Sequence, residues 1–251
     1  MKYNIENNSS RNDEYTKNLD RNKILKNLIT ADTPLIFDIG ANKGTTISDF
    51  KNIWMNCRIH CFEPQFECWE SLDNLEKKYE GSLMLNKTAV GSKDQKNVSF
   101  FSHEITTEQS GFYKINAEAN DSILLKKMQS NKEIGRYINS INHERFVDVI
   151  RLDTYMKNNG IDNIDLLKID TQGHEPEMLE GLGDKLQNTN VVLTELMFFD
   201  YYERSLSFSD LEKFLLPAGF KFFDISHISK NPMNGRTDWV DLIYVNENFN
   251  Y

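Results

Sequence analysis

The chain has 251 residues, 39% of them hydrophobic, with 38 acidic and 29 basic residues and a formal net charge of −9. This length and hydrophobic content can fill a buried core, which argues against a largely disordered chain. The acidic balance argues against a protein that coats nucleic acid, because phosphates need a basic surface.

The cysteine and hydropathy patterns bear on the compartment. The three cysteines, Cys57, Cys61 and Cys68, form no CxxC pair, as is typical of thiols in a reducing compartment. No segment approaches the ~20 consecutive apolar residues of a membrane span. The N-terminal stretch lacks the apolar centre of a signal peptide. We therefore expect a cytoplasmic protein.

Residues 1–30 predict an N-terminal helical extension, because apolar residues share one helical face between Asp13 and Ile29. From Leu35 onward, short apolar strands alternate with amphipathic helices. Strands are predicted at 35–38, 58–63, 82–86, 164–170, 190–196, 220–225 and 239–245, and helices at 45–55, 65–79, 177–186 and 209–216. This alternation predicts a mainly parallel sheet, and the short loop before the last strand predicts a final antiparallel pair.

The alternation breaks between residues 102 and 146, a polar and partly helical stretch between predicted strands at 97–101 and 147–152. We interpret it as an insertion that caps a substrate site. Residues 31–251, with this insertion, are predicted to form a single domain.

The segment "FDIGANKG" places a glycine turn directly after the first strand. Gly40 and Gly44 do not have the spacing of a phosphate-binding loop. A dinucleotide-binding turn needs a glycine where Asn42 stands, because the backbone there approaches a pyrophosphate. The turn therefore favours a ligand without a pyrophosphate.

Two carboxylates narrow the choice of ligand. Glu63 ends the second strand 19 residues after Gly44, where an acidic residue can accept hydrogen bonds from both ribose hydroxyls. Asp38, beside the turn, would repel a phosphate but suits an ammonium or sulfonium group. Either residue alone could be structural, Asp38 as a helix cap and Glu63 as a surface acid. Together with the turn they indicate S-adenosylmethionine.

The segments "FDIGANKG", "CFEP", "TAVG", "RLDTYM", "IDLLKIDTQGHEPEMLEG" and "VVLTEL" together resemble the FkbM family of S-adenosylmethionine-dependent methyltransferases over residues 35–225. The resemblance implies an α/β, Rossmann-like class I methyltransferase fold: a seven-stranded, mostly parallel sheet that ends in an antiparallel hairpin, with helices on both faces. It also implies methylation of oxygen, often on sugars or natural-product hydroxyls.

The resemblance also implies cofactor contacts. The residues that it places around the methionine portion are Asp38, Gly40, Ala41, Asn42 and Gly44. It places Glu63 and Pro64 at the ribose, and Thr88 and Ala89 near the adenine. Ser122 and Asp170 are further expected contacts, although the sequence around Ser122 departs from the family's Ser-Ser-Leu pattern.

A sugar hydroxyl is a poor nucleophile until a base or a metal removes its proton. Ligands bind at the carboxyl ends of the strands in such sheets. Asp170 and Glu195 end two central strands, and His174 and Glu175 follow Asp170, so these four are the predicted catalytic residues. Alternatively, Asp170 and Glu195 could share a divalent cation through their oxygen atoms.

The insertion supplies the predicted acceptor contacts. Arg136 and Arg145 could receive an anionic acceptor such as a nucleotide sugar, and Tyr113 and Tyr201 could floor a sugar pocket. The basic residues could equally form a solvent-exposed helical face.

Other functions stay open at this point. The chain could be an N-methyltransferase of a small amine-bearing metabolite, a nicotinamide oxidoreductase, or a non-catalytic nucleoside-binding module. We expect a small-molecule or nucleotide-sugar substrate and no nucleic-acid partner. The oligomeric state stays open, although the N-terminal helix could pair with that of a second copy of the chain.

Overall fold

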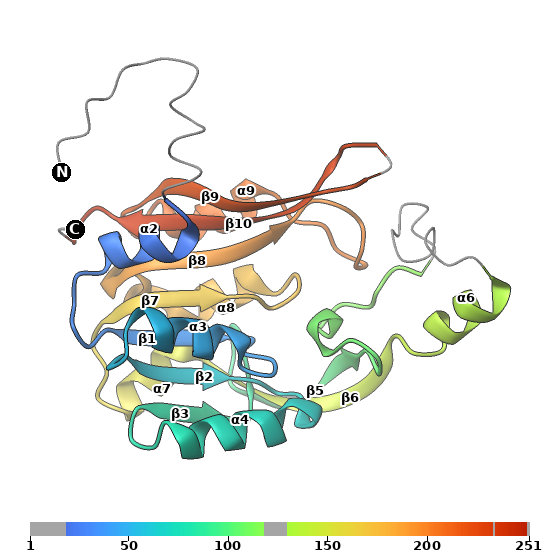
Figure 1. The fold of residues 1–251 in the computed structure, drawn as a ribbon, viewed down its shortest axis with the longest axis horizontal. Helices are drawn as coiled ribbons and strands as arrows, with labels where there is room; N and C mark the ends of the chain where they lie inside the picture. The colour runs from blue at the N-terminus through green and yellow to red at the C-terminus, as the bar shows by residue number, and fades with distance from the viewer. Residues whose placement is uncertain (1–18, 118–129, 233, 250–251) are drawn as a thin grey trace.

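The computed structural model describes residues 19–117, 130–232 and 234–249. Its main sheet has seven strands in the order β3-β2-β1-β7-β8-β10-β9 (Figure 1). The strands are β1 (Leu35–Ile39), β2 (Arg58–Phe62), β3 (Leu83–Asn86), β7 (Ile164–Ile169), β8 (Thr189–Met197), β9 (Phe220–Lys230) and β10 (Thr237–Asn246). Neighbours pair in parallel except where β10 meets β8 and β9. The predicted Rossmann-like class I fold is confirmed.

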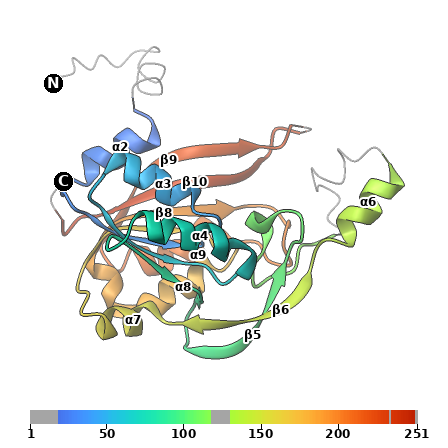
Figure 2. The same ribbon diagram turned by 60° about the horizontal axis from the view of Figure 1, so that its bottom comes forward.

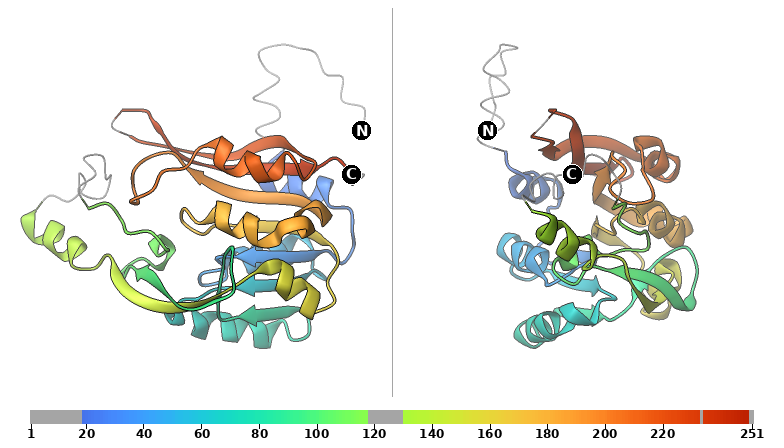
Figure 3. Two further views of the ribbon diagram at one scale, coloured as in Figure 1. Left: turned by 180° about the vertical axis from the view of Figure 1, so that it is seen from behind. Right: turned by 90° about the vertical axis from the view of Figure 1, so that its right-hand side faces the viewer.

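Helices cover both faces of this sheet (Figures 2 and 3). On one face lie α2 (Arg21–Leu28), α3 (Thr45–Ile53) and α4 (Phe66–Lys78), and on the other α7 (Leu152–Asn158), α8 (Glu175–Leu182) and α9 (Phe208–Leu215). Each set buries an apolar stripe against the strands, which is the main source of stability in such a layered domain. None of the helices in the described ranges is long and apolar enough to cross a membrane.

The described part of the N-terminal extension is packed into this core. Leu25 of α2 is fully buried, and Leu28 and Ile29 join the same apolar cluster as Ile36 of β1 and Ile243 of β10. Helix α2 begins at Arg21 after Asp20, whose side chain accepts the Lys23 N–H. The earlier part of the predicted 13–29 helix lies outside the described residues.

A second, smaller sheet stands beside the carboxyl ends of the parallel strands. It consists of β4 (Ala89–Val90), β5 (Gln95–Ser102) and β6 (His143–Ile150) in the order β4-β6-β5. The connector between β5 and β6 contains the short helix η1 (Thr107–Gln109) and α6 (Asn131–Ile138), and α6 lies farthest from the main sheet (Figure 1). The predicted insertion is thus partly built into this sheet.

Several predicted boundaries were wrong. The strand predicted at 220–225 continues as β9 to Lys230. The strand predicted at 147–152 ends at Ile150, and Leu152 opens α7, a helix that the sequence reading missed although Leu152 and Met156 have helical spacing. The helix predicted at 177–186 begins at Glu175 and stops at Leu182, because Gly183 has a positive φ of 50° and leads into η2 (Gly183–Asn188).

The turn after β1 touches the end of β7 directly. Gly40 has φ +77°, and a Cβ atom there would lie 1.9 Å from the carbonyl oxygen of Asp170. The Asp170 N–H donates to the Ile39 carbonyl at 3.0 Å. Only glycine allows the two strand ends to approach this closely.

We therefore expect Gly40→Ala to destabilise the fold beyond the backbone strain of a positive φ, which is about 1–2 kcal/mol. Gly160→Ala is the matched control, because Gly160 also has a positive φ, 64°, but a Cβ there meets nothing within 4 Å. Urea unfolding of both variants measures the difference. Equal losses of unfolding free energy would contradict the close approach at Gly40.

Candidate cofactor and active site

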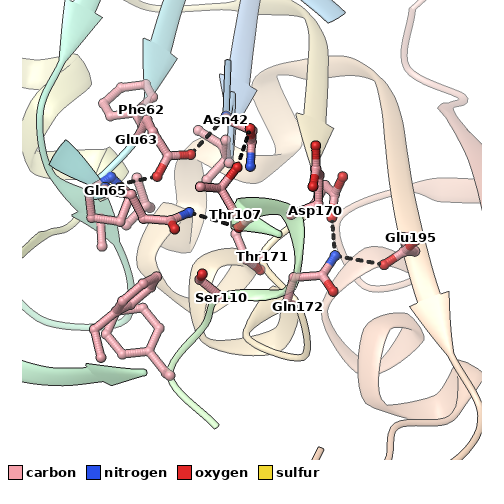
Figure 4. A pocket seen from close by; sticks show the side chains of 18 residues that line it. Asn42, Phe62, Glu63, Gln65, Thr107, Ser110, Asp170, Thr171, Gln172 and Glu195 are labelled. Atoms are coloured by element: carbon pink, nitrogen blue, oxygen red, sulfur yellow. Dashed lines mark hydrogen bonds between the residues drawn. The ribbon is translucent and has the colours of Figure 1, made fainter. Parts of the chain in front are cut away.

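A cavity of about 190 Å³ opens at the carboxyl ends of the parallel strands (Figure 4). Its walls come from the turn after β1, the end of β2, strand β4, the β5–β6 connector, the turn after β7, and β8. The predicted site residues that line it are Gly40, Asn42, Glu63, Pro64, Ala89, Asp170 and Glu195. The topology therefore brings these predicted residues, from five of the six segments, to one place.

Glu63 is buried at one end of this cavity. Its Oε2 accepts the Asn42 backbone N–H at 2.8 Å, and its Oε1 accepts the Gln65 backbone N–H at 2.9 Å. Burial raises the pKa of Glu63 to about 7, although these amide donors act in the opposite direction. Each oxygen retains a lone pair for a further donor, as the two hydroxyls of a ribose require.

Asp38 does not line the cavity. It is fully buried, and its Oδ1 lies 3.1 Å from Nζ of Lys168, which also donates to the Gly40 carbonyl at 2.8 Å. Burial acts to lower the pKa of Lys168, but the charges of Asp38 and Asp170 outweigh it, so the pKa is raised and the ammonium stays charged. The sequence reading missed Lys168, although a lysine within an apolar strand signals a buried partner.

At the other end, Gln172 joins two carboxylates. Its Nε2 lies 2.6 Å from Asp170 Oδ1 and 3.1 Å from Glu195 Oε2. The Tyr202 hydroxyl donates to Gln172 Oε1 at 2.6 Å, which fixes the orientation of the amide. Burial, and then the charge of Asp170, raises the pKa of Glu195 well above its usual value. Gln172 was not predicted as a site residue, although its position in the turn directly after Asp170 could have indicated one.

The other two predicted catalytic residues lie behind this turn, outside the cavity lining. Glu175 is buried, and its Oε1 accepts the Thr171 N–H, the Thr171 hydroxyl and the Gly173 N–H. The His174 ring packs against Phe112, tilted by 35° with ring centroids 4.2 Å apart, and burial lowers its pKa to about 4, so the ring is neutral at pH 7. Glu175 thus organises the backbone that carries Gln172.

Within residues 19–117, 130–232 and 234–249, no group of three or more His, Cys, Asp or Glu side chains is arranged to hold a metal ion. Asp170 and Glu195, the pair predicted as possible ligands, are instead linked through the Gln172 amide. The cysteines Cys57, Cys61 and Cys68 are free and buried.

Besides Asp38, three predicted cofactor residues of the described ranges do not line the cavity, namely Ala41, Gly44 and Thr88. The Ala41 carbonyl accepts the Gly44 N–H at 2.9 Å, which closes the turn before α3. Thr88 donates its hydroxyl to the Asp148 carbonyl at 2.8 Å and does not line the cavity. Ser122 lies outside the described residues.

The four predicted acceptor residues also lie outside the cavity lining. The Tyr113 hydroxyl contacts Arg204 and Glu177, and the Tyr201 hydroxyl lies 3.2 Å from that of Tyr137. On the second sheet, Arg145 lies 3.6 Å from a carboxylate oxygen of Glu67, and Arg136 is exposed on α6. That these residues bind the acceptor stays a prediction.

Comparison with known proteins finds methyltransferases that are similar to this chain in sequence or in fold. NoeI, a 2-O-methyltransferase of Sinorhizobium fredii (strain NBRC 101917 / NGR234), is 23% identical over 200 residues, covering 76% of this chain and 74% of that protein. The solved methyltransferase FkbM from Methylobacillus flagellatus KT matches with a TM-score of 0.52 at 13% identity. That match covers 85% of this chain but 44% of the other, so this chain spans less than half its length, and the likeness concerns the fold alone.

The family model described as "Methyltransferase FkbM domain" matches residues 38–222, which include the end of β1, all of β2, β7 and β8, and every predicted residue of the cavity lining. The chain therefore belongs to the FkbM methyltransferases, and it is an S-adenosylmethionine-dependent methyltransferase.

Proposed function

We propose that this methyltransferase acts on a hydroxyl oxygen of a sugar. The observation that carries the proposal is a single cavity with a ribose-type carboxylate, Glu63, at one end and the linked pair Asp170 and Glu195 at the other. NoeI, by name a 2-O-methyltransferase, supports oxygen as the methylated atom. Family membership sets aside the oxidoreductase and non-catalytic alternatives.

The residues of the cavity fit S-adenosylmethionine. Glu63 would accept the ribose hydroxyls, and the apolar lining from Phe62, Ala89 and Val90 suits the flat adenine. The turn at Gly40 and Asn42 would hold the methionine portion. When bound, S-adenosylmethionine supplies a methyl group on a sulfonium, which is already a good leaving group.

The chain's own task is then to orient the acceptor and remove its proton. Glu195 is suited to be the base, because a raised pKa makes its carboxylate more basic than that of an exposed glutamate. Gln172 holds Glu195 beside Asp170, so the hydroxyl would meet a fixed carboxylate pair. His174 is outside the cavity lining, and Glu175 already accepts three hydrogen bonds in the turn.

The lining favours an uncharged sugar ring. Its charged members are Glu63, Glu108, Asp170 and Glu195, and no lysine or arginine of the described residues is among them. A phosphate in the cavity would meet these carboxylates without a cation. If the acceptor is a nucleotide sugar, its diphosphate would therefore lie outside, toward the second sheet.

Cofactor affinity should depend on pH through Glu63. The ribose hydroxyls donate, so they need the ionised carboxylate, and its pKa of about 7 in the free protein places the change near neutrality. Affinity for S-adenosylhomocysteine should be full above this pKa and fall as the pH drops below it, by up to about tenfold per pH unit.

Calorimetric titration between pH 5.5 and 8.5, a range bracketing the pKa of about 7, measures this dependence. Glu63→Gln should bind more weakly and lose this dependence on pH. Glu180→Gln, at an exposed position of α8 outside the cavity lining, is the control and should keep it. A pH-independent wild-type affinity would contradict the role of Glu63.

Glu195→Gln should lower kcat by roughly 10²- to 10⁴-fold, the usual contribution of a general base. Its affinity for S-adenosylhomocysteine should stay within about twofold of the wild-type value, because no cofactor contact is assigned to Glu195. Glu180→Gln, an exposed carboxylate on α8, is the control and should leave kcat unchanged. Unchanged turnover in Glu195→Gln would remove Glu195 from the reaction.

The acceptor class can be tested by mass spectrometry of reactions with labelled S-adenosylmethionine. The panel pairs free sugars and glycosides with their phosphorylated forms, nucleotide sugars and simple amines. We expect a methyl ether on a sugar, with phosphorylated sugars the poorest acceptors. Transfer to amine nitrogen alone would contradict the proposal and support an N-methyltransferase.

A further inference from the structure

Thr107 stands between the second sheet and the cofactor end of the cavity. It opens η1 in the β5–β6 connector, it is buried, and it lines the same cavity as Glu63 (Figure 4). It lies far along the chain from the glycine turn, and the sequence reading assigned it no role.

Its contacts reach both neighbours of Glu63. The Thr107 hydroxyl donates to Asn42 Oδ1 at 3.1 Å, and the Thr107 carbonyl accepts Nε2 of Gln65 at 3.1 Å. Asn42 and Gln65 are the two residues whose backbone N–H groups bind the two carboxylate oxygens of Glu63. One residue of the connector thus holds the side chains of both amide donors.

The backbone conformation of Asn42 needs support from side-chain contacts such as that with the Thr107 hydroxyl. Asn42 has φ +47°, a left-handed conformation that is strained for a residue other than glycine. Its side-chain oxygen also accepts the Lys43 N–H at 2.7 Å. The Thr107 hydroxyl and, at 3.7 Å, the Cys68 thiol donate to the same oxygen, so the Asn42 side chain is fixed from outside the turn and its backbone N–H is held toward Glu63.

We propose that Thr107 is a positioning residue of the cofactor site, which aligns the two amide donors that hold Glu63 for the ribose. The proposal rests on the proposed role of Glu63 in cofactor binding. It assigns the second sheet a part in cofactor affinity, because the connector that carries Thr107 continues through Ser110 and Phe112, which line the same cavity.

Other titratable groups around Glu63 must stay constant for a pH readout to report on it. Those that face it are Lys168 on β7, Cys61 on β2, Cys68 on α4, and Glu108 beside Thr107 in the cavity lining. None of these is changed in the variants below, so a shift of the pH midpoint reports on how Glu63 is held.

The test is calorimetric titration with S-adenosylhomocysteine across pH. Thr107→Val, which keeps the shape but loses the hydroxyl, should weaken binding by about fivefold to tenfold, as expected for one lost hydrogen bond. The pH midpoint of binding should also move upward, because less aligned amides stabilise the carboxylate less. Thr107→Ser should restore both values. Thr106→Val, the same change one residue earlier and half exposed, should match the wild type.

Gln65→Met provides an independent variant if Thr107→Val does not fold. It removes the side-chain amide, which donates to the Thr107 carbonyl and also acts to lower the pKa of Glu63 directly, but it keeps the backbone N–H on Glu63. Both losses should shift affinity and midpoint in the same direction as Thr107→Val. The positioning role of Thr107 alone would be overturned if Thr107→Val or Gln65→Met kept the wild-type affinity and pH midpoint while Glu63→Ala lost binding. No binding by the wild type, or unchanged binding by Glu63→Ala, would overturn the proposed cofactor site as well.

Discussion

The site depends on one buried cation. Lys168 rises from the middle of the sheet and meets Asp38 of the neighbouring strand, the Gly40 carbonyl and, at 3.6 Å, the Asp170 carboxylate. A buried ammonium without a partner costs free energy, because it has lost its hydration. Moving these acceptors away from Lys168 would incur that cost, so they stay in contact with it. Lys168 therefore fixes the position of the glycine turn after β1 relative to the end of β7, which is followed by Asp170. These two segments lie at the two ends of the cavity, so Lys168 also fixes the distance between those ends.

At both ends of the cavity, amide N–H groups hold carboxylates in place, but the amides differ. Glu63 is buried and held by two backbone amides, and its pKa is raised to about 7. Asp170 and Glu195 are held by one side-chain amide, that of Gln172, which Tyr202 orients. In each case a carboxylate is kept at the cavity by donors that leave lone pairs free. The first arrangement suits a diol that donates, and the second suits a hydroxyl that must lose its proton.

Much of this could be read from the sequence, because it depends on local order along the chain. Alternating strands and helices predict parallel strand ends at one edge, so Gly40, Glu63, Asp170 and Glu195 were expected together, and all four line the cavity. The same reasoning placed His174 and Glu175 in the reaction only because they follow Asp170. The structure places both residues behind the lining, where His174 packs against Phe112 and Glu175 accepts from Thr171, and sequence adjacency does not reveal this.

The missed residues depend on contacts across the fold. Lys168 needs Asp38 from another strand, and Thr107 reaches Asn42 over 65 positions. Strand β4 has two residues, too few to form a pattern, yet it anchors the second sheet beside the cavity. No periodicity predicts which loop of an insertion returns to the glycine turn, so the role of the connector emerges only from the three-dimensional arrangement.

The central claim is that S-adenosylmethionine spans the cavity from Glu63 to the turn at Asp170. A crystal structure of the full chain with S-adenosylhomocysteine tests this most directly. We expect both ribose hydroxyls within hydrogen-bond distance of the Glu63 carboxylate and the sulfur on the side of Asp170 and Glu195. A nucleoside bound elsewhere, or ribose hydroxyls without contact to Glu63, would contradict it.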